Sequence, residues 1–200
     1  MLDKPARHDS GAINPYPYGF DPTFHRYKLD EPQKWMKPRT IFVCSMADLF
    51  GSWVPDIVIK KVFDACAKAP QHRYMFLTKH PRRYIDLSRK NLLPSDVDMW
   101  FGSTVTKPED EFFFDRTRNT FISIEPIMAP FKEIGMDADK TDLIIIGAET
   151  GNRKGKIIPE KEWIDELITM VDHNHVAIFM KESMRGLMGS DFRQELPWEA

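Results

Sequence analysis

The sequence predicts an α/β fold in which repeated strand–helix units form a parallel sheet, curved into a partial TIM-like (β/α)6 barrel. Six short apolar runs each stop on a polar or charged residue, at 41–48, 74–79, 99–106, 120–125, 142–149 and 176–182. Successive runs begin 21 to 34 residues apart, which leaves room for a crossover and excludes two-residue hairpins. No Gly-x-Gly-x-x-Gly follows the first run, which disfavours an open dinucleotide-binding sheet. Polar residues at all six strand ends favour the barrel.

Helices are expected between these strands wherever a proline opens a segment with apolar residues at helical spacing. Four segments fit, and they begin at Pro55, Pro81, Pro108 and Pro159. The segment after Pro81 is short and basic, and the one after Pro108 carries three consecutive phenylalanines at 112–114.

Residues 1–38 differ from the remainder, 39–200, which we interpret as a single barrel domain. The first segment combines six prolines with six tyrosine, phenylalanine and tryptophan residues. Prolines at this density prevent long helices and central strands, whereas the aromatics argue against disorder. We expect an irregular arm that ends in a short helix over 29–35.

Composition limits the classes of protein that fit. The chain has 200 residues, 42% hydrophobic, with a formal net charge of −2, so no overall field favours nucleic acid or a membrane surface. No apolar run approaches the ~20 residues of a membrane span, and the N-terminus lacks the apolar core of a signal peptide. We expect a cytoplasmic protein.

The two cysteines give no sign of a disulfide framework or a metal site. Cys44 and Cys66 are far apart and form no Cys-x-x-Cys pair. Cys44 falls inside the first expected strand and Cys66 on the apolar face of the next helix, so both are predicted to be buried. The histidines show no metal-ligand spacing.

The C-terminal ends of the strands and the loops that follow them, which we call the rim, supply the candidate functional residues. Ligands bind α/β sheets at that edge. Asp48 follows the first strand and either contacts a ligand or caps a turn. Lys79 follows the second strand and either binds a carboxylate or phosphate or pairs with a rim acid. Arg82 and Arg83, in a first helical turn, indicate an anionic ligand or a solvated basic face.

Two glutamates stand out on neighbouring strands. Pro126 favours an extended backbone at Glu125, whose carboxylate is expected to point into the opening of the barrel at the strand ends. Glu149 is its counterpart at the end of the next strand. The two could act as an acid/base pair or bind the ammonium and hydroxyls of a polar cofactor. In a third interpretation, Lys79 and Lys181 neutralise them in a structural network.

Five segments in order carry a resemblance to a known family: 42–50, 76–79, 100–105, 123–126 and 145–151. Together with 24–38, they resemble a large bacterial and phage family of unknown function that is related to radical S-adenosylmethionine (SAM) enzymes. The resemblance spans residues 24–182. It implies a partial barrel, SAM, and a [4Fe–4S] cluster held by three cysteines in a Cys-x-x-Cys-Tyr-Ala segment.

The resemblance also implies roles for the strand-end residues. The cofactor-binding candidates are Thr104, Ser123, Glu125, Gly147 and Glu149. The candidates for contact with substrate or cofactor, and hence for catalysis, are Asp48, Lys79 and Lys181.

The chain departs from this family pattern because no cysteine-rich motif is present. We expect either a product that has lost an upstream segment or a variant without the cluster, and no cofactor bound by the chain as written. Two alternatives follow. One is a non-catalytic barrel module that binds a small or anionic ligand, or a partner chain that supplies a strand. The other is a nucleic-acid-associated phage protein with basic patches at 82–83 and 153–154.

Overall fold

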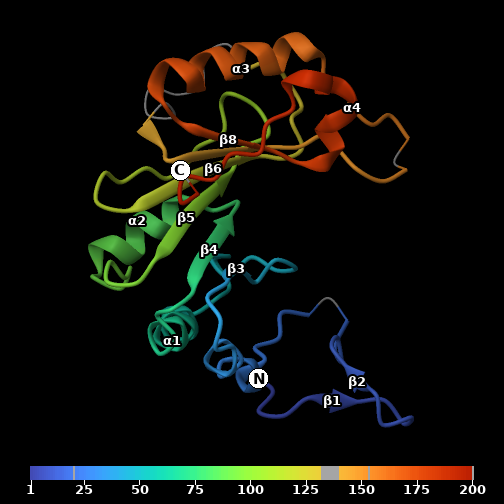
Figure 1. The fold of residues 1–200 in the computed structure, drawn as a ribbon. Coiled ribbons are helices and arrows are strands. Elements are labelled where there is room, and N and C mark those ends of the chain that lie inside the picture. Colours follow the sequence, from blue (N-terminus) through green and yellow to red (C-terminus); the bar gives the residue numbers. More distant parts are fainter. Residues whose placement is uncertain (20, 132–139, 153, 200) are drawn as a thin grey trace.

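The computed structural model describes residues 1–19, 21–131, 140–152 and 154–199, and its main feature is a six-stranded parallel sheet. The strands are β3 (Thr40–Val43), β4 (Arg73–Thr78), β5 (Met99–Thr104), β6 (Asn119–Ile124), β7 (Leu143–Ile146) and β8 (Ala177–Met180). They pair in chain order, and the sheet curls into a half-barrel (Figure 1). This confirms the predicted fold class, because a doubly wound sheet would reverse its strand order at a switch point.

Helices cover the outer, convex side of the sheet (Figure 1). They are α1 (Asp56–Ala67), α2 (Arg82–Arg89), α3 (Lys161–Asn174) and the short α4 (Arg185–Met188). Helices α1 and α2 pack on β3–β5, and α3 and α4 pack on β6–β8, so the convex core has two apolar clusters. The three helices expected after Pro55, Pro81 and Pro159 are therefore confirmed.

The prediction of a helix after Pro108 is wrong. Residues 107–118 form turns and irregular chain. The carboxylate of Asp110 accepts hydrogen bonds from the Thr106 N–H, the Thr106 hydroxyl and the Lys107 N–H. These local bonds offer the backbone an alternative to helix, and the Phe113 N–H instead donates to the Ser103 hydroxyl.

The concave face has its own apolar layer. Met75, Trp100, Phe121, Leu143 and Ile145 are buried there, one from each of β4 to β6 and two from β7. The Phe121 ring lies over Gly102, its register partner on β5, where a side chain on Gly102 would overlap the ring. This layer fills the lower part of the half-barrel and leaves the strand ends above it for polar residues.

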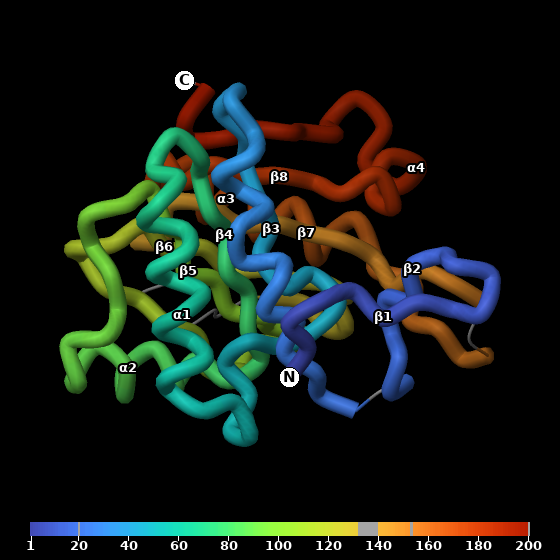
Figure 2. Tube along the Cα trace, turned by 90° about the horizontal axis from the view of Figure 1, so that it is seen from below, coloured from blue at the N-terminus to red at the C-terminus, as the bar shows by residue number. Residues whose placement is uncertain are grey.

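The N-terminal arm has little regular structure. It contains a short hairpin of β1 (Ala6–Arg7) and β2 (Ile13–Asn14) and two 3-10 turns, Arg26–Lys28 and Pro32–Lys34. The second turn stands where a short helix is predicted. In both overall views the hairpin lies on the opposite side of the molecule from α1 and α2 (Figures 1 and 2). Buried His72 fastens the end of the arm, since its ring contacts the Arg39 N–H and the Pro32 carbonyl.

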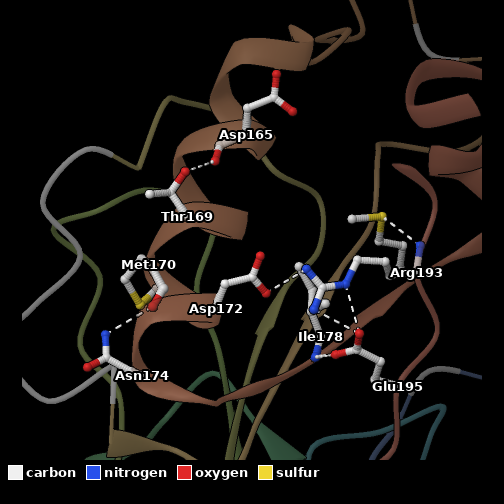
Figure 3. Close-up of polar contacts among 9 residues, drawn as sticks. Asp165, Thr169, Met170, Asp172, Asn174, Ile178, Arg193 and Glu195 are labelled. Carbon is white, nitrogen blue, oxygen red and sulfur yellow. Dashed lines mark hydrogen bonds and ion pairs between the residues drawn. The ribbon is translucent and has the colours of Figure 1, made fainter. Parts of the chain in front are cut away.

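The C-terminal tail closes one edge of the sheet. The Met180 N–H donates to the Arg193 carbonyl at 2.8 Å, and the Glu195 N–H donates to the Ile178 carbonyl at 2.8 Å, so the tail runs along β8. Arg193 binds both Asp172 of α3 and Glu195 (Figure 3). At the other end of the sheet, β3 pairs only with β4 within the described ranges.

Candidate functional site

The strand register brings several predicted site residues to one face of the sheet. Thr104 pairs in register with Ser123, Ser123 with Ile145, and Ile145 with Phe179. The ladder continues one residue further, because the Gly147 N–H donates to the Ile124 carbonyl at 3.0 Å and the Lys181 N–H to the Ile146 carbonyl at 2.8 Å. Side chains two residues apart share a face. Glu125, Gly147 and Lys181 therefore form the next row above Thr104 and Ser123, on the concave side.

Glu125 and Lys181 form an ion pair across this row. The Lys181 Nζ lies 3.2 Å from the Glu125 Oε2, and the two side chains are 45% and 34% exposed, respectively. Gly147 lies between them, directly after β7, and an added Cβ there would stand 3.0 Å from Glu125 Cγ and Oε1. The absence of a side chain at Gly147 thus leaves the space in which the Glu125 carboxylate lies. A pair this accessible to water contributes at most about 1 kcal/mol to stability.

Glu149 lies in the loop that follows β7, and its carboxylate accepts a 3.4 Å hydrogen bond from the Ile157 N–H. The same loop is tied to the segment after β8, because the Ala148 N–H donates to the Ser183 hydroxyl. Glu125 is thus directed toward Lys181 and Glu149 toward the 150–157 loop. This arrangement favours the interpretation in which Lys181 neutralises a rim carboxylate. Arg153 of the predicted basic patch lies outside the described residues, and Lys154 is exposed.

Asp48 connects two rim loops. Its carboxylate accepts hydrogen bonds from the Phe50 N–H at 2.9 Å, the Thr78 hydroxyl at 2.8 Å and the Lys79 N–H at 3.0 Å. The bond to Phe50 is the turn cap that the sequence allows, and the other two attach the β3–α1 loop to the end of β4. Asp48 therefore holds the rim together at the β3 end of the sheet.

The predicted basic residues of the β4–α2 region divide into paired and exposed side chains. Arg82 forms a bidentate pair with Glu111. Arg83 donates to the Val54 carbonyl at 2.9 Å and pairs with Asp56. Lys79 is exposed, and the structure records no ion pair for it among the residues that it describes. Lys79 is thus the cation of this group that remains open to a ligand.

The cysteines differ from each other, contrary to the expectation that both are buried. Cys44 follows the end of β3, has a φ of +56° and is exposed. The strand ends at Val43, well short of the end of the predicted run at 41–48, because this left-handed backbone cannot continue a ladder. Cys66 is buried in α1, and burial raises its pKa to about 12.

A [4Fe–4S] cluster does not fit these residues. The sequence holds two cysteines, one fewer than the three that such a site needs, and Cys66 is shielded by the core. Within the described part of the chain, no group of three histidine, cysteine or acidic side chains is placed to hold a metal ion.

One aromatic pair at the rim was not predicted from the sequence. Trp53, in the β3–α1 loop, is 57% exposed, and its ring lies 5.9 Å from that of His80 at an interplanar angle of 89°. The signal that could have revealed it is a tryptophan two residues after Gly51, in a loop that follows a strand end.

Two surface hollows are lined by residues other than Asp48, Lys79, Glu125, Glu149 and Lys181. One, of about 410 Å³, lies between α2 and residues 108–112, and its wall includes the paired Arg82 and Glu111. The other, of about 440 Å³, lies between α3 and the tail at 190–193. The first is formed by the start of α2 and the loop after β5, and the second by α3 and the C-terminal tail. The rim residues above are instead placed by the strand ends.

Comparison with known proteins identifies the family. A family model described as a protein of unknown function, DUF5131, matches residues 5–188. The chain belongs to this family. The DUF5131 match takes in most of the N-terminal arm, which the resemblance at 24–182 only partly covers. No curated protein and no solved structure matches the chain. None of the helices in the described ranges is both long and apolar enough to traverse a membrane.

Proposed function

We propose that this chain binds a nucleoside that carries a zwitterionic amino-acid group, SAM being the example, at the rim of the half-barrel. The observation that carries the proposal is the pairing of Glu125 and Lys181 across Gly147. An α-amino acid presents an ammonium and a carboxylate on one carbon. Glu125 would accept hydrogen bonds from the ammonium, and Lys181 would donate to the carboxylate.

The electrostatics favour exchange of the internal pair for the ligand. Both side chains are partly exposed, so they can turn toward a ligand with little loss of stability. The ligand then offers two charge-assisted hydrogen bonds where the free protein has one ion pair. Thr104, half-buried at the end of β5 and one row below, is the hydroxyl that we assign to the ribose.

The resemblance at 24–182 is to a family related to radical SAM enzymes, and that relation supports SAM within this ligand class. It does not extend to their chemistry in this chain, since the cysteines do not fit a cluster. When SAM and a cluster are bound together, such enzymes generate a radical from SAM. The function proposed for the residues present is therefore ligand binding, in which Glu125 and Lys181 orient the amino-acid end of the nucleoside.

Isothermal titration calorimetry with four compounds tests this proposal. We expect binding of SAM and S-adenosylhomocysteine. We expect binding at least about tenfold weaker for methylthioadenosine and methionine, because each lacks one half of the ligand. Glu125→Gln and Lys181→Met should each weaken SAM binding. Lys60→Met is the matched control, since it removes a partly exposed lysine that pairs with Asp64 on α1.

A charge-reversed double variant sharpens the test. Glu125→Lys with Lys181→Glu keeps an ion pair across Gly147 but exchanges its poles, so the folded protein should retain its stability and lose SAM affinity. Equal binding of SAM and methylthioadenosine, or unchanged SAM binding by Lys181→Met, would contradict the proposal.

A second candidate function, binding of a partner chain, is favoured by the open edge of β3. Strand β3 pairs only with β4 among the described residues, and Phe42 at this edge is 41% exposed. An unpaired strand edge is a template for another strand. If the partner is a second copy, the mass measured by light scattering should double with concentration and the Phe42 amide should become protected from hydrogen exchange. A constant monomer mass with a rapidly exchanging amide would exclude the second copy.

A further inference from the structure

Trp53 occupies an unusual position at the β3–β4 end of the rim. Its neighbours in the β3–α1 loop, Phe50 and Val54, pack into the convex core, whereas Trp53 belongs to none of the apolar clusters that the described residues form and is 57% exposed. Leaving a large indole in water gives the fold little packing in return. This position therefore calls for a role other than packing.

The indole is nevertheless held in one place. Gly51 lies beneath it, and a Cβ there would stand 2.5 Å from the indole Cζ2. The ring of His80 contacts it in a T-shaped arrangement. Gly51 and His80 thus support the indole on two sides while much of its surface stays open to solvent.

The two loops that carry these rings are fastened to each other. Asp48 accepts hydrogen bonds from Phe50 and Lys79, one on each loop, and from Thr78. The Thr78 hydroxyl in turn accepts the His80 N–H at 2.9 Å. Arg83 holds the far side of the tryptophan loop by donating to the Val54 carbonyl. A ligand that stacks on Trp53 would find the ring already ordered, so little conformational entropy is lost on binding.

The charge beside the ring indicates the ligand. Arg82 and Arg83 are paired with acidic residues, whereas Lys79, adjacent to His80, is exposed with no ion pair recorded in the described part of the chain. A flat indole face recognises a planar π-system, and a neighbouring ammonium recognises an anion. A nucleotide combines the two in one molecule.

We propose that Trp53, supported by Gly51 and His80, is a stacking site for the base of a nucleotide whose phosphate is met by Lys79. The nucleotide is either free or part of a single strand. This site goes beyond the function proposed above, because Trp53 and Lys79 belong to the β3–β4 end of the rim and Glu125 and Lys181 to the β6–β8 end.

The test measures AMP and adenosine binding by calorimetry, and binding of a fluorescently labelled ten-residue deoxyadenosine strand by anisotropy. Stacking on an aromatic side chain is worth enough that Trp53→Ala should weaken binding by about tenfold or more, whereas Trp53→Phe should lose less. Gly51→Ala should also weaken binding, since it displaces the ring without removing it. Lys79→Met should weaken AMP but not adenosine.

Matched controls exclude general effects. Tyr18→Ala removes an equally exposed aromatic, 57%, from the N-terminal arm and should leave binding unchanged. Lys68→Met removes an exposed lysine at the end of α1 and should also leave binding unchanged. Glu125→Gln should not change AMP binding, because AMP has no zwitterion. This measurement distinguishes failure of the stacking site from failure of the function proposed above.

Each outcome decides the proposal. Binding of AMP assigns the site to free nucleotides, and binding of the oligonucleotide alone assigns it to single strands. The proposal is overturned if neither binds, if Trp53→Ala binds both as the wild type does, or if Glu125→Gln removes AMP binding while Trp53→Ala does not. Circular dichroism and the melting temperature confirm that each variant is folded.

Discussion

Glu125 and Lys181 form their 3.2 Å ion pair although they follow strands that are not neighbours. Strand β7 lies between them and presents Gly147 at the point where the two side chains meet. The contact thus depends on three consecutive strands of the sheet being in register. The contact also gives a structural reason for glycine at position 147, since the Glu125 carboxylate occupies the space that a side chain at 147 would need.

Gly147→Ala should therefore disturb the pair. The new Cβ would press on Glu125 Cγ and Oε1, and overpacking of this kind destabilises a protein by about 1–3 kcal/mol. We expect a loss near the lower value, since Glu125 is partly exposed and can move. Urea unfolding measures it. Combining Gly147→Ala with Glu125→Ala should remove most of the penalty. Gly186→Ala is the control, because an added Cβ there would meet no described atom within 4 Å beyond its chain neighbours and its own helix backbone. Additive effects of Gly147→Ala and Glu125→Ala would contradict this account.

Gly102→Ala should be more damaging. The added methyl would overlap the buried Phe121 ring in the centre of the concave layer, where neither strand can move away. We expect destabilisation of about 3 kcal/mol in urea unfolding, or failure to fold. The double variant with Phe121→Leu should be more stable than Gly102→Ala alone, because the smaller side chain vacates the overlap. A double variant no more stable than Gly102→Ala would show that the ring is not the obstacle.

The two thiols should react at very different rates. Cys44 is exposed, although desolvation and the Asp48 carboxylate raise its pKa, and burial raises the pKa of Cys66 to about 12. Since the thiolate is the reactive form, Ellman's reagent at pH 8 should label one thiol in the native protein, more slowly than it labels free cysteine, and two in urea. Cys44→Ser should abolish the native reaction. Labelling of both thiols in the native state would place Cys66 outside the core.

Asp56 should contribute to the pH dependence of stability. Its pKa is lowered from 3.8, chiefly by the hydrogen bond from Lys90 and by Arg83, against some desolvation. A carboxyl whose pKa is lower in the folded state stabilises the protein above 3.8, and this contribution is lost as the pH falls through the folded pKa. For partly exposed partners we expect about 0.5–1 kcal/mol.

The measurement is the free energy of unfolding in urea at pH 7 and pH 3 for the wild type and Asp56→Asn. The wild type should lose more stability between the two pH values than the variant, because only the wild type has the charge to lose. Glu109→Gln serves as the control, because Glu109 is exposed and has no ion pair recorded with any described residue. An equal loss in the wild type and in Asp56→Asn would exclude the contribution.

Much of the sheet could be predicted from sequence because its central strands, β4 to β7, are buried on both faces for most of their length. Such strands are continuous apolar runs, and the polar residue that ends each run marks the rim. The run at 143–146 is the clearest case, since all four residues of β7 are buried. Errors arose where a local interaction competes with the pattern: Asp110 replaces the helix after Pro108 with a turn, and the left-handed backbone of Cys44 ends β3 early.

The residues of the candidate site could be predicted from the sequence, but the contacts among them could not. The parallel strand order implied that Thr104, Ser123, Glu125, Gly147 and Lys181 reach one edge. The sequence carries no information on which carboxylate meets which lysine, because that depends on the register and on how strongly the sheet curves. Glu149 had the same pattern as Glu125, yet its carboxylate meets the Ile157 backbone of its own loop.

By itself, the sequence of this chain determined the number, order and direction of the strands in the six-stranded sheet, because the periodic placement of apolar residues and the length of the crossovers are local properties. Only the tertiary structure decided that Lys181 closes on Glu125 across Gly147, that Asp48 joins two loops, and that Trp53 stands exposed beside His80. These contacts join residues far apart in the chain. Their distances follow from the curvature of the sheet and the packing of its loops, which no short window of sequence contains.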